Sequence, residues 1–321
     1  MSNFGNNEAP ILGAEGRSSE VGNDAWVYAP TRKAAKFAKW RNPIGIAGAI
    51  IVGLNVLIAL LGKYIWSIDP DELVAIRLQS PSWAHPMGTD ELGRDVFARI
   101  IHGAQVSLQV GVISVSIAFV LGVSLGLLAG FFGGWLDSAL MRFVDLLFAL
   151  PGLVLAIVIA GMLGPNRRNA MIAIGIVIAP AFARVVRGAV LEVMGFPFVE
   201  STRALGSSHS RVMARHVIPN IAAPLIVLVT VYLATAILSE AALSFLGLGT
   251  QPPEASWGGM LNSARSYLDI APWLSIFPGI AIMIVVLGFN FLGDGLRDIL
   301  DPRLGPHVGG AEKKGGRDTR A

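Results

Sequence analysis

The 321-residue sequence contains no cysteine. This absence excludes disulfides, zinc ribbons, iron–sulfur clusters and thiol catalysis. Charge is also scarce, because Asp, Glu, Lys and Arg together make up 15% of the chain, whereas hydrophobic residues make up 53%. With a mean hydropathy of +0.61, the composition is far from that of soluble domains and indicates that lipid is the solvent for most of the chain.

The motifs of several chemistries are missing as well. The sequence has no G-x-x-x-x-G-K-[ST], so the chain lacks a phosphate-binding loop for ATP. Its five histidines show no metal-ligand spacing, and no basic patch with interleaved aromatic residues suggests nucleic acid. We therefore predict that the chain is not an enzyme and binds no metal or cofactor itself.

One match to a catalytic motif has a simpler interpretation. Residues 122–126 read Gly-Val-Ser-Leu-Gly, which fits the hydrolase pattern G-x-S-x-G. That motif requires a strand, a sharp turn and then a helix, but here it lies inside a long apolar run. We interpret Gly122, Gly126 and Gly130 as small residues that let two helices approach closely. A membrane-embedded hydrolase remains the best enzyme alternative, and no cluster of nucleophile, acid and histidine supports it.

Long apolar runs predict an all-α membrane protein with six spans. Residues 1–40 are expected to be a largely disordered tail, 41–66 the first span and 67–105 a polar segment outside the membrane. Residues 106–304 are expected to form a five-helix core, followed by a tail at 305–321. The core spans are expected at about 107–130, 139–163 with a kink at Pro151, 169–186, 221–246 and 271–292. The span at 169–186, the fourth of the six, is short because Arg184 and Arg187 follow an apolar run of only about fifteen residues. It therefore needs snorkelling arginines or shielding by neighbouring helices.

The distribution of Lys and Arg predicts the orientation. Six spans place both ends of the chain on one side, and most basic residues lie on that side. Because cytoplasmic loops carry the excess of Lys and Arg, both termini and residues 188–220 are predicted to be cytoplasmic.

Charged residues within or near the spans are functional candidates by default. Glu240 lies near the external end of the fifth span, where it could line a solute path or pair across a helix interface. Asp137, Arg142 and Asp145 lie at helical spacing near a membrane surface, and salt-bridged helix ends are the simpler explanation for them.

Residues 198–219 form a mixed polar segment between the fourth and fifth spans. Two short helical stretches are predicted there, broken at Gly206 and stopped at Pro219. Apolar side chains recur at helical spacing: Val199, Ala204, Leu205, Val212 and Met213. A compact helix-turn-helix of this kind suits a groove on a partner protein.

This segment resembles the cytoplasmic loop of the permease subunits of ABC importers. That loop carries E-A-A, three variable residues, G, nine variable residues, I, one variable residue and L-P. Glu200, Gly206 and Pro219 fall in register, and Ile218 occupies the leucine position. Ser201 and Thr202 replace the two alanines, and His216 replaces the isoleucine.

Further motifs resemble the dipeptide, oligopeptide and nickel branch of this family, specifically its C-type permease subunit. They are residues 85–95 (HPMGTDELGRD), 240–249 (EAALSFLGLG), Pro253 with 256–260 (SWGGM), 290–298 (NFLGDGLRD) and 301–304 (DPRL). The likeness covers about residues 40–305.

The resemblance implies a type I ABC importer permease fold (MetI-like) in the bacterial inner membrane. It also implies a homologous B-type permease, two ATP-binding subunits that hold ATP and Mg, and a periplasmic or lipid-anchored solute-binding protein. The residues implied to couple this chain to the ATPase are Glu200, Ser201, Thr202, Arg203, Ala204, Leu205, Gly206, Ser207, Ile218 and Pro219. Peptides are the expected solutes, with nickel complexes and glutathione left open. A stand-alone channel or secondary transporter would also have six spans, but it gives no reason for residues 200–219.

Overall fold

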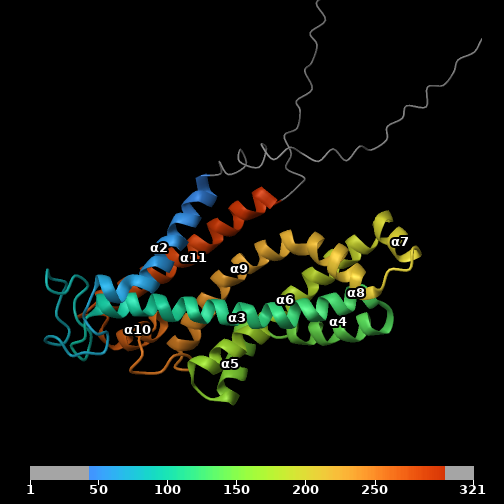
Figure 1. The fold of residues 1–321 in the computed structure, drawn as a ribbon. Coiled ribbons are helices and arrows are strands. Elements are labelled where there is room, and N and C mark those ends of the chain that lie inside the picture. The colour runs from blue at the N-terminus through green and yellow to red at the C-terminus, as the bar shows by residue number, and fades with distance from the viewer. Residues whose placement is uncertain (1–42, 301–321) are drawn as a thin grey trace, which may run out of the picture.

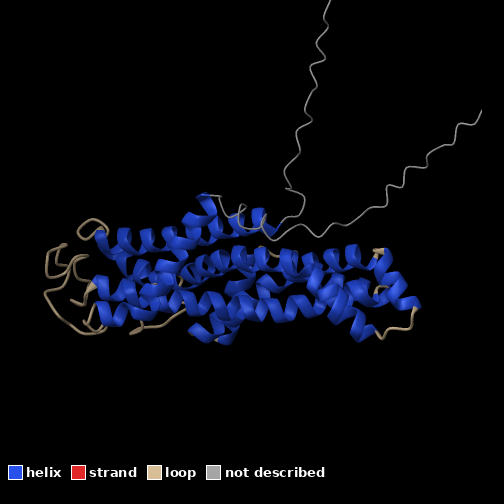
Figure 2. Ribbon diagram, turned by 45° about the horizontal axis from the view of Figure 1, so that its top comes forward, coloured by secondary structure: helices blue, strands red, loops and turns tan. Residues whose placement is uncertain are grey.

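The structure, a computed structural model, describes residues 43–300 as an elongated bundle of helices (Figure 1). Figure 2 shows long helices, with loops gathered mainly at one end of the bundle. The tails predicted at 1–40 and 305–321, and the motif at 301–304, lie outside the described residues. The elements are α2 (Pro43–Ile65), α3 (Val96–Phe132), α4 (Gly134–Phe148), α5 (Gly152–Leu163), α6 (Arg167–Met194), α7 (Pro197–Ala204), α8 (His209–Val212), the π-helical turn η2 (Met213–Val217), α9 (Ile218–Phe245), α10 (Trp257–Ala264), the 3-10 turn η3 (Arg265–Tyr267) and α11 (Trp273–Leu300).

Five helical segments within residues 43–300 are long and apolar enough to cross a membrane: α2, α3, α6, the run from α8 through α9, and α11. The pair α4 and α5 makes a sixth only if it counts as one span, because the two helices are bent by 89°. The predicted all-helical membrane fold is confirmed. The predicted kink at Pro151 is a complete break, since helix α4 ends at Phe148 and Pro151 precedes α5. A proline disfavours the helical conformation of the residue before it, so the chain leaves the helix there.

Helices α3 and α6 pack along each other and form the centre of the core. The interpretation of the glycines in α3 is confirmed at this contact. A Cβ atom on Gly122 would lie 2.3 Å from the carbonyl oxygen of Ala179, and one on Gly126 would lie 2.5 Å from that of Ala183. Because backbone atoms occupy the space, only glycine lets the two helices come this close.

The Gly126→Ala substitution is therefore expected to lower the free energy of unfolding by about 1–3 kcal/mol through overpacking. Thermal unfolding of the detergent-solubilised protein measures this. Gly53→Ala in α2 is the matched control, because a Cβ at Gly53 has no atom within 4 Å among the described residues. That change should be neutral or slightly stabilising, and equal losses in both variants would contradict the packing argument.

Three helices extend well beyond their predicted bounds, and one of them is α11, which runs to Leu300 rather than to about residue 292. Helix α3 begins at Val96 rather than near residue 107, so the segment between α2 and α3 is 66–95 and not 67–105. Helix α6 runs to Met194, beyond the predicted end at 186. Hydropathy placed the start of α3 too late and the end of α6 too early, because Arg99, Arg184 and Arg187 interrupt the apolar pattern. In the structure acidic side chains pair with all three arginines, which removes the need to end the helix.

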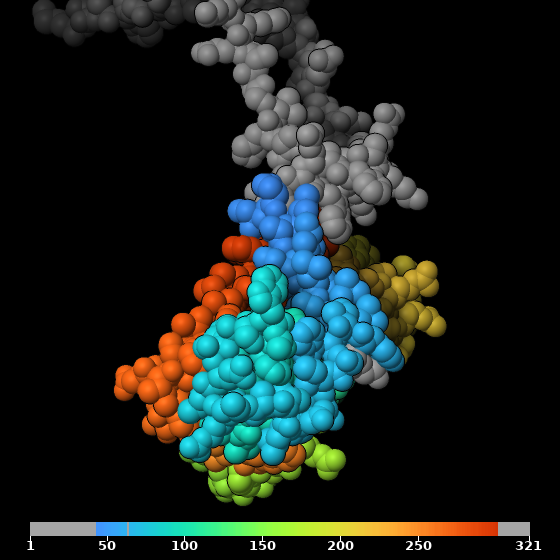
Figure 3. Space-filling view, turned by 90° about the vertical axis from the view of Figure 1, so that its left-hand side faces the viewer, coloured from blue at the N-terminus to red at the C-terminus, as the bar shows by residue number. Residues whose placement is uncertain are grey.

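The molecule has two distinct ends. Residues 66–95 gather over the end that we call the loop end, where α10 and the start of α11 also lie (Figure 1). Figure 3 views this end and shows the segment as a compact cap in cyan, beside the orange residues that follow α9. The short helices α7 and α8 lie at the opposite end, which we call the α7 end.

Candidate coupling segment and buried polar networks

The segment between α6 and α9 begins with the short helix α7, which contains Glu200 to Ala204. Pro197 stands in its first turn, where a missing backbone N–H is harmless. The hydroxyls of Ser201 and Thr202 donate hydrogen bonds to the carbonyl oxygens of Pro197 (2.9 Å) and Phe198 (2.7 Å). Both hydroxyl groups therefore find their hydrogen-bond acceptors within α7 and need no partner elsewhere in the chain.

Gly206 ends α7 with a φ of +80°, as the sequence predicted for a helix break at this position. The backbone N–H of Gly206 donates to the carbonyl of Arg203 (2.9 Å), and that of Ser207 donates to the carbonyl of Thr202 (3.3 Å). This pair of bonds is the Schellman arrangement, which requires a left-handed residue at the glycine position. The turn is thus built into the local sequence.

Two valines hold the segment against the bundle. Val199 and Val212 are fully buried and belong to the main hydrophobic core. The prediction that they face a partner's groove is therefore wrong, because they fill space between α7, α8 and the long helices. The opposite surface is open: Leu205 is 86% exposed, and Glu200, Arg203, Ala204 and Gly206 are exposed as well. A single exposed leucine does not mark a contact surface. Here the exposed residues are neighbours on one short helix and its turn, so together they form a continuous surface.

Pro219 does not stop the segment, contrary to the prediction. Ile218 and Pro219 lie in the first turn of α9, which continues from the π-helical turn Met213–Val217. A proline ring clashes with the carbonyl of the residue four positions earlier. The wider π turn just before Pro219 relieves that clash, so the helical path continues from α8 into α9.

Glu240 lies near the loop end of α9 and is 1% exposed. Its Oε1 accepts hydrogen bonds from the hydroxyls of Ser244 (2.6 Å) and Thr250 (3.4 Å), while the Ser244 hydroxyl accepts from the backbone N–H of Thr250 (3.0 Å). The carboxyl group thereby fastens the loop that follows α9. This burial argues for the structural alternative, and the solute-path role of Glu240 stays a prediction.

Glu240→Ala should lower the free energy of unfolding by about 1–3 kcal/mol, because two buried hydroxyls lose their acceptor. Glu240→Gln keeps an acceptor oxygen and the side-chain volume, so it should assemble normally. Uptake kinetics of the assembled Gln variant separate the two roles. Unchanged kinetics are expected from a structural carboxyl group, and altered solute uptake would instead favour a position in the path.

Ion pairs link α4 to α6. Arg187 binds both carboxylate oxygens of Asp137, at 2.5 and 2.6 Å, and Arg184 binds Asp145 at 2.8 Å. The salt bridges expected for Asp137 and Asp145 are present, but their partners come from another helix and not from α4 itself. Pairing with carboxylates of α4 therefore accommodates both arginines of the fourth span, although Arg184 remains 56% exposed.

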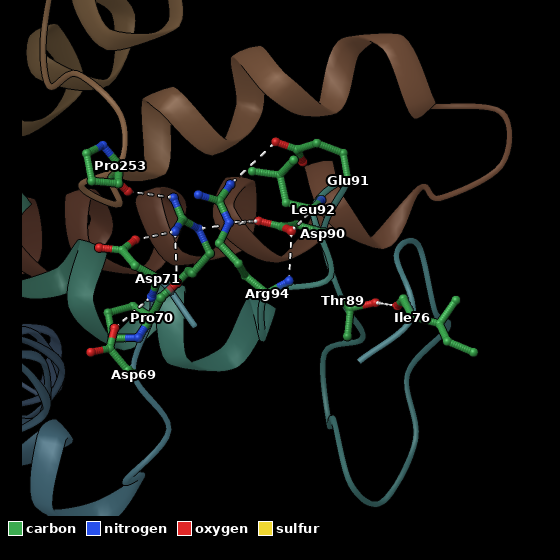
Figure 4. A network of polar contacts seen from close by, with 11 residues as sticks. Asp69, Pro70, Asp71, Ile76, Thr89, Asp90, Glu91, Leu92, Arg94 and Pro253 are labelled. Carbon is green, nitrogen blue, oxygen red and sulfur yellow. Dashed lines mark hydrogen bonds and ion pairs between the residues drawn. The ribbon is translucent and has the colours of Figure 1, made fainter. Parts of the chain in front are cut away.

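At the loop end, a polar network joins residues 66–95 to α3 and to the loop after α9 (Figure 4). Arg99 donates to the carbonyl of Pro70 (2.9 Å), to the Asp71 carboxylate (2.9 Å) and to the carbonyl of Pro253 (3.4 Å). Arg94 donates to Asp90 at 2.6 Å, and Asp90 also accepts two backbone N–H groups. Both arginines are buried, Arg94 at 8% exposure and Arg99 at 6%.

This network gives part of the motif at 85–95 a structural role, because residues of the motif bind one another and hold the segment in a folded conformation. His85 pairs with Asp95 at 2.7 Å, and Asp95 also caps the start of α3 by accepting from the N–H of Ala98. The ion pair between Arg99 and Asp71 was not identified from the sequence, because two residues so far apart along the chain show no sequence pattern that predicts their contact. No group of three or more metal-ligating side chains occurs within residues 43–300.

Comparison with known proteins agrees with this architecture. A family model described as binding-protein-dependent transport system inner membrane component matches residues 122–306. The dipeptide transport system permease protein DppC of Alkalihalophilus pseudofirmus is 44% identical over 296 residues, covering 92% of this chain and 97% of that protein. The glutathione transport system permease protein GsiD of Pectobacterium atrosepticum is 43% identical over 266 residues, covering 82% and 88%.

A solved structure shares the fold. The inward-facing MetNI methionine ABC transporter contains a chain that superimposes with a TM-score of 0.54 at 19% identity, covering 64% of this chain and 97% of that one. At this identity the likeness establishes the fold, and the MetI-like architecture expected from the sequence is confirmed.

Proposed function

Because this chain belongs to the family of binding-protein-dependent transport system inner membrane components, and is thus a permease subunit of an ABC importer, we propose that α7 and the turn at Gly206 couple it to an ATP-hydrolysing partner. The observation that carries the proposal is the construction of this segment. Buried Val199 and Val212 anchor it, whereas Leu205 and the turn are exposed. A short helix held rigidly on one side and open on the other can transmit a push into the membrane helices.

The length of α3 supports the placement of this segment beyond the bilayer. At 1.5 Å per residue its 37 residues extend about 55 Å, whereas the hydrocarbon core is about 30 Å thick. The end of α3 at the α7 end contacts α8, because the ring of His209 packs against the rings of Phe131 and Phe132 at 5.7 and 6.3 Å. We propose that this end and both termini are cytoplasmic, in line with the distribution of Lys and Arg.

The partner set follows from the same proposal. This chain would form the solute path with a second, homologous permease, while two ATP-binding subunits hold ATP and Mg and a solute-binding protein delivers the solute at the loop end. Closure of the ATPase pair would move α7 as a rigid body and shift the permease pair between two access states.

Short peptides are the proposed solutes. The names of two relatives specify dipeptides and glutathione, and glutathione is itself a tripeptide. Nickel complexes remain the second candidate from the sequence resemblance, and no feature of the described residues favours them over peptides.

Uptake by the complete complex in proteoliposomes tests the proposal. We expect dipeptide or glutathione uptake to require the solute-binding protein outside the vesicle and ATP on the side that α7 faces. Uptake at the same rate without nucleotide, or by this chain without ATP-hydrolysing subunits, would contradict it.

A further inference from the structure

The face of α4 and α6 that carries Arg184 and Asp145 is open in the single chain. Both residues lie in candidate spanning segments, yet their side chains are 56% and 64% exposed in the single chain. Turning such charges toward lipid tails costs several kcal/mol, so charged residues in spans face a bundle interior or an aqueous cavity. The guanidinium group of Arg184 also lies over the ring of Phe148, 4.2 Å from its centre.

A cavity of about 200 Å³ opens beside this ion pair, at the corner where α4 gives way to α5. Phe148 contributes to its wall, as does Ala181, one turn before Arg184 on α6. Gly152 and Leu153 of α5 line the side created by the break between the two helices. The cavity therefore adjoins the exposed face that carries this ion pair.

Helix α9 lines the cavity with three hydroxyl groups, those of Tyr232, Thr235 and Ser239. They lie on one face because their spacing follows the helical repeat. The hydroxyls of Thr235 and Ser239 donate to backbone carbonyls at 3.2 and 2.8 Å, which leaves their acceptor lone pairs available. The Tyr232 hydroxyl has no hydrogen-bond partner within residues 43–300, and its half-buried ring packs on Phe182 at 5.4 Å.

We propose that this hydroxyl-lined cavity is a solute contact site, in which Tyr232, Thr235 and Ser239 hydrogen-bond neutral amide and carbonyl groups of a peptide main chain. The inference rests on the proposed function and extends it to named path residues. None of the described residues that line the cavity is charged, so the site suits neutral groups common to all peptides over any particular side chain. At about 200 Å³ the cavity is smaller than a typical ligand pocket, and the second permease would supply its remaining wall.

The absence of cysteine from this chain makes a direct test simple. Single-cysteine variants Thr235→Cys and Ser239→Cys are assembled with their partner subunits and treated with a charged, membrane-impermeant thiol reagent. Modification of this chain is quantified after the subunits are separated. Because the reactive species is the hydrated thiolate, a cysteine in an aqueous path should react at least about tenfold faster than one facing lipid. A dipeptide present in excess should slow the reaction.

Ser124→Cys is the matched control. Ser124 is an exposed serine of α3 that makes the same hydrogen bond to the carbonyl four residues earlier (2.6 Å), but it lies outside the cavity. The inference would be overturned if Thr235→Cys and Ser239→Cys react no faster than Ser124→Cys. That result would mean that either lipid or the second permease covers this face.

Removal of the hydroxyls provides a functional readout. The double variant Thr235→Val, Ser239→Ala should raise the KM for peptide uptake about threefold to tenfold. The Ser124→Ala variant should match the wild type. ATP-dependent uptake with an unchanged KM would reject this site and leave the coupling proposal intact, whereas uptake independent of ATP would reject the coupling proposal itself.

Discussion

The Gly206→Leu variant is expected to assemble with its partners and to lose most of its ATP-driven uptake. A leucine at a φ of +80° is strained by about 1–2 kcal/mol, which opposes the Schellman turn that ends α7. A Cβ at Gly206 has no described atom within 4 Å, so the chain itself has room for the side chain. The added bulk instead projects from the exposed surface that would enter the partner's groove.

If docking is weakened by at least about 1.4 kcal/mol, coupled uptake should fall about tenfold or more. Solute uptake and ATP hydrolysis are measured on the same purified complexes, whose subunit ratio reports assembly. Gly206→Asn is the control for the backbone, because asparagine tolerates the left-handed conformation and adds less bulk. It should retain more uptake than Gly206→Leu, and normal uptake by a fully assembled Gly206→Leu complex would count strongly against the assignment.

The Arg99→Leu variant is expected to destabilise the loop end. Arg99 is 6% exposed and lies within 3.7 Å of the buried Asp90 carboxylate, and it also binds Pro70, Asp71 and Pro253. Removing one partner from a buried ionic network leaves the other charges uncompensated. Because Asp71 is partly exposed, the lower end of the usual range applies, a loss of about 3 kcal/mol in the free energy of unfolding.

Thermal unfolding and protease cleavage within residues 66–95 measure the effect of Arg99→Leu. Arg77→Leu is the matched control, since Arg77 belongs to the same segment and is exposed. We expect Arg77→Leu to behave like the wild type in both measurements. Comparable protease sensitivity in the two variants would mean that Arg99 does not hold the segment in place.

Apolar runs predicted the order of the spans, and also their number if α4 and α5 count as one span, because lipid imposes a length and a composition on each. They failed at helix ends where a charge is paired by a residue far away in the sequence. Arg99 with Asp71 and Arg187 with Asp137 are such pairs, and neither separation has a local signature. Hydropathy therefore ended α6 too early and started α3 too late.

Local rules succeeded where the chain itself determines the geometry. Gly206 was predicted to break a helix, and the left-handed turn is present. Pro219 was judged by the same kind of rule, but the π turn that accommodates it cannot be read from a single sequence. The direction in which Val199 and Val212 face also depends on the surrounding helices, because helical spacing defines a face without saying what covers it.

A cross-link from the turn after α7 tests the central claim most directly. Leu205→Cys places the only cysteine of this chain on an 86% exposed position at the tip of the segment. With a short photoactivatable thiol-linked probe on Leu205→Cys, we expect this chain to form a covalent adduct with the ATP-hydrolysing subunit in the intact complex. Labelling of the same cysteine by an impermeant reagent only from the external side, with no adduct to that subunit, would contradict the account.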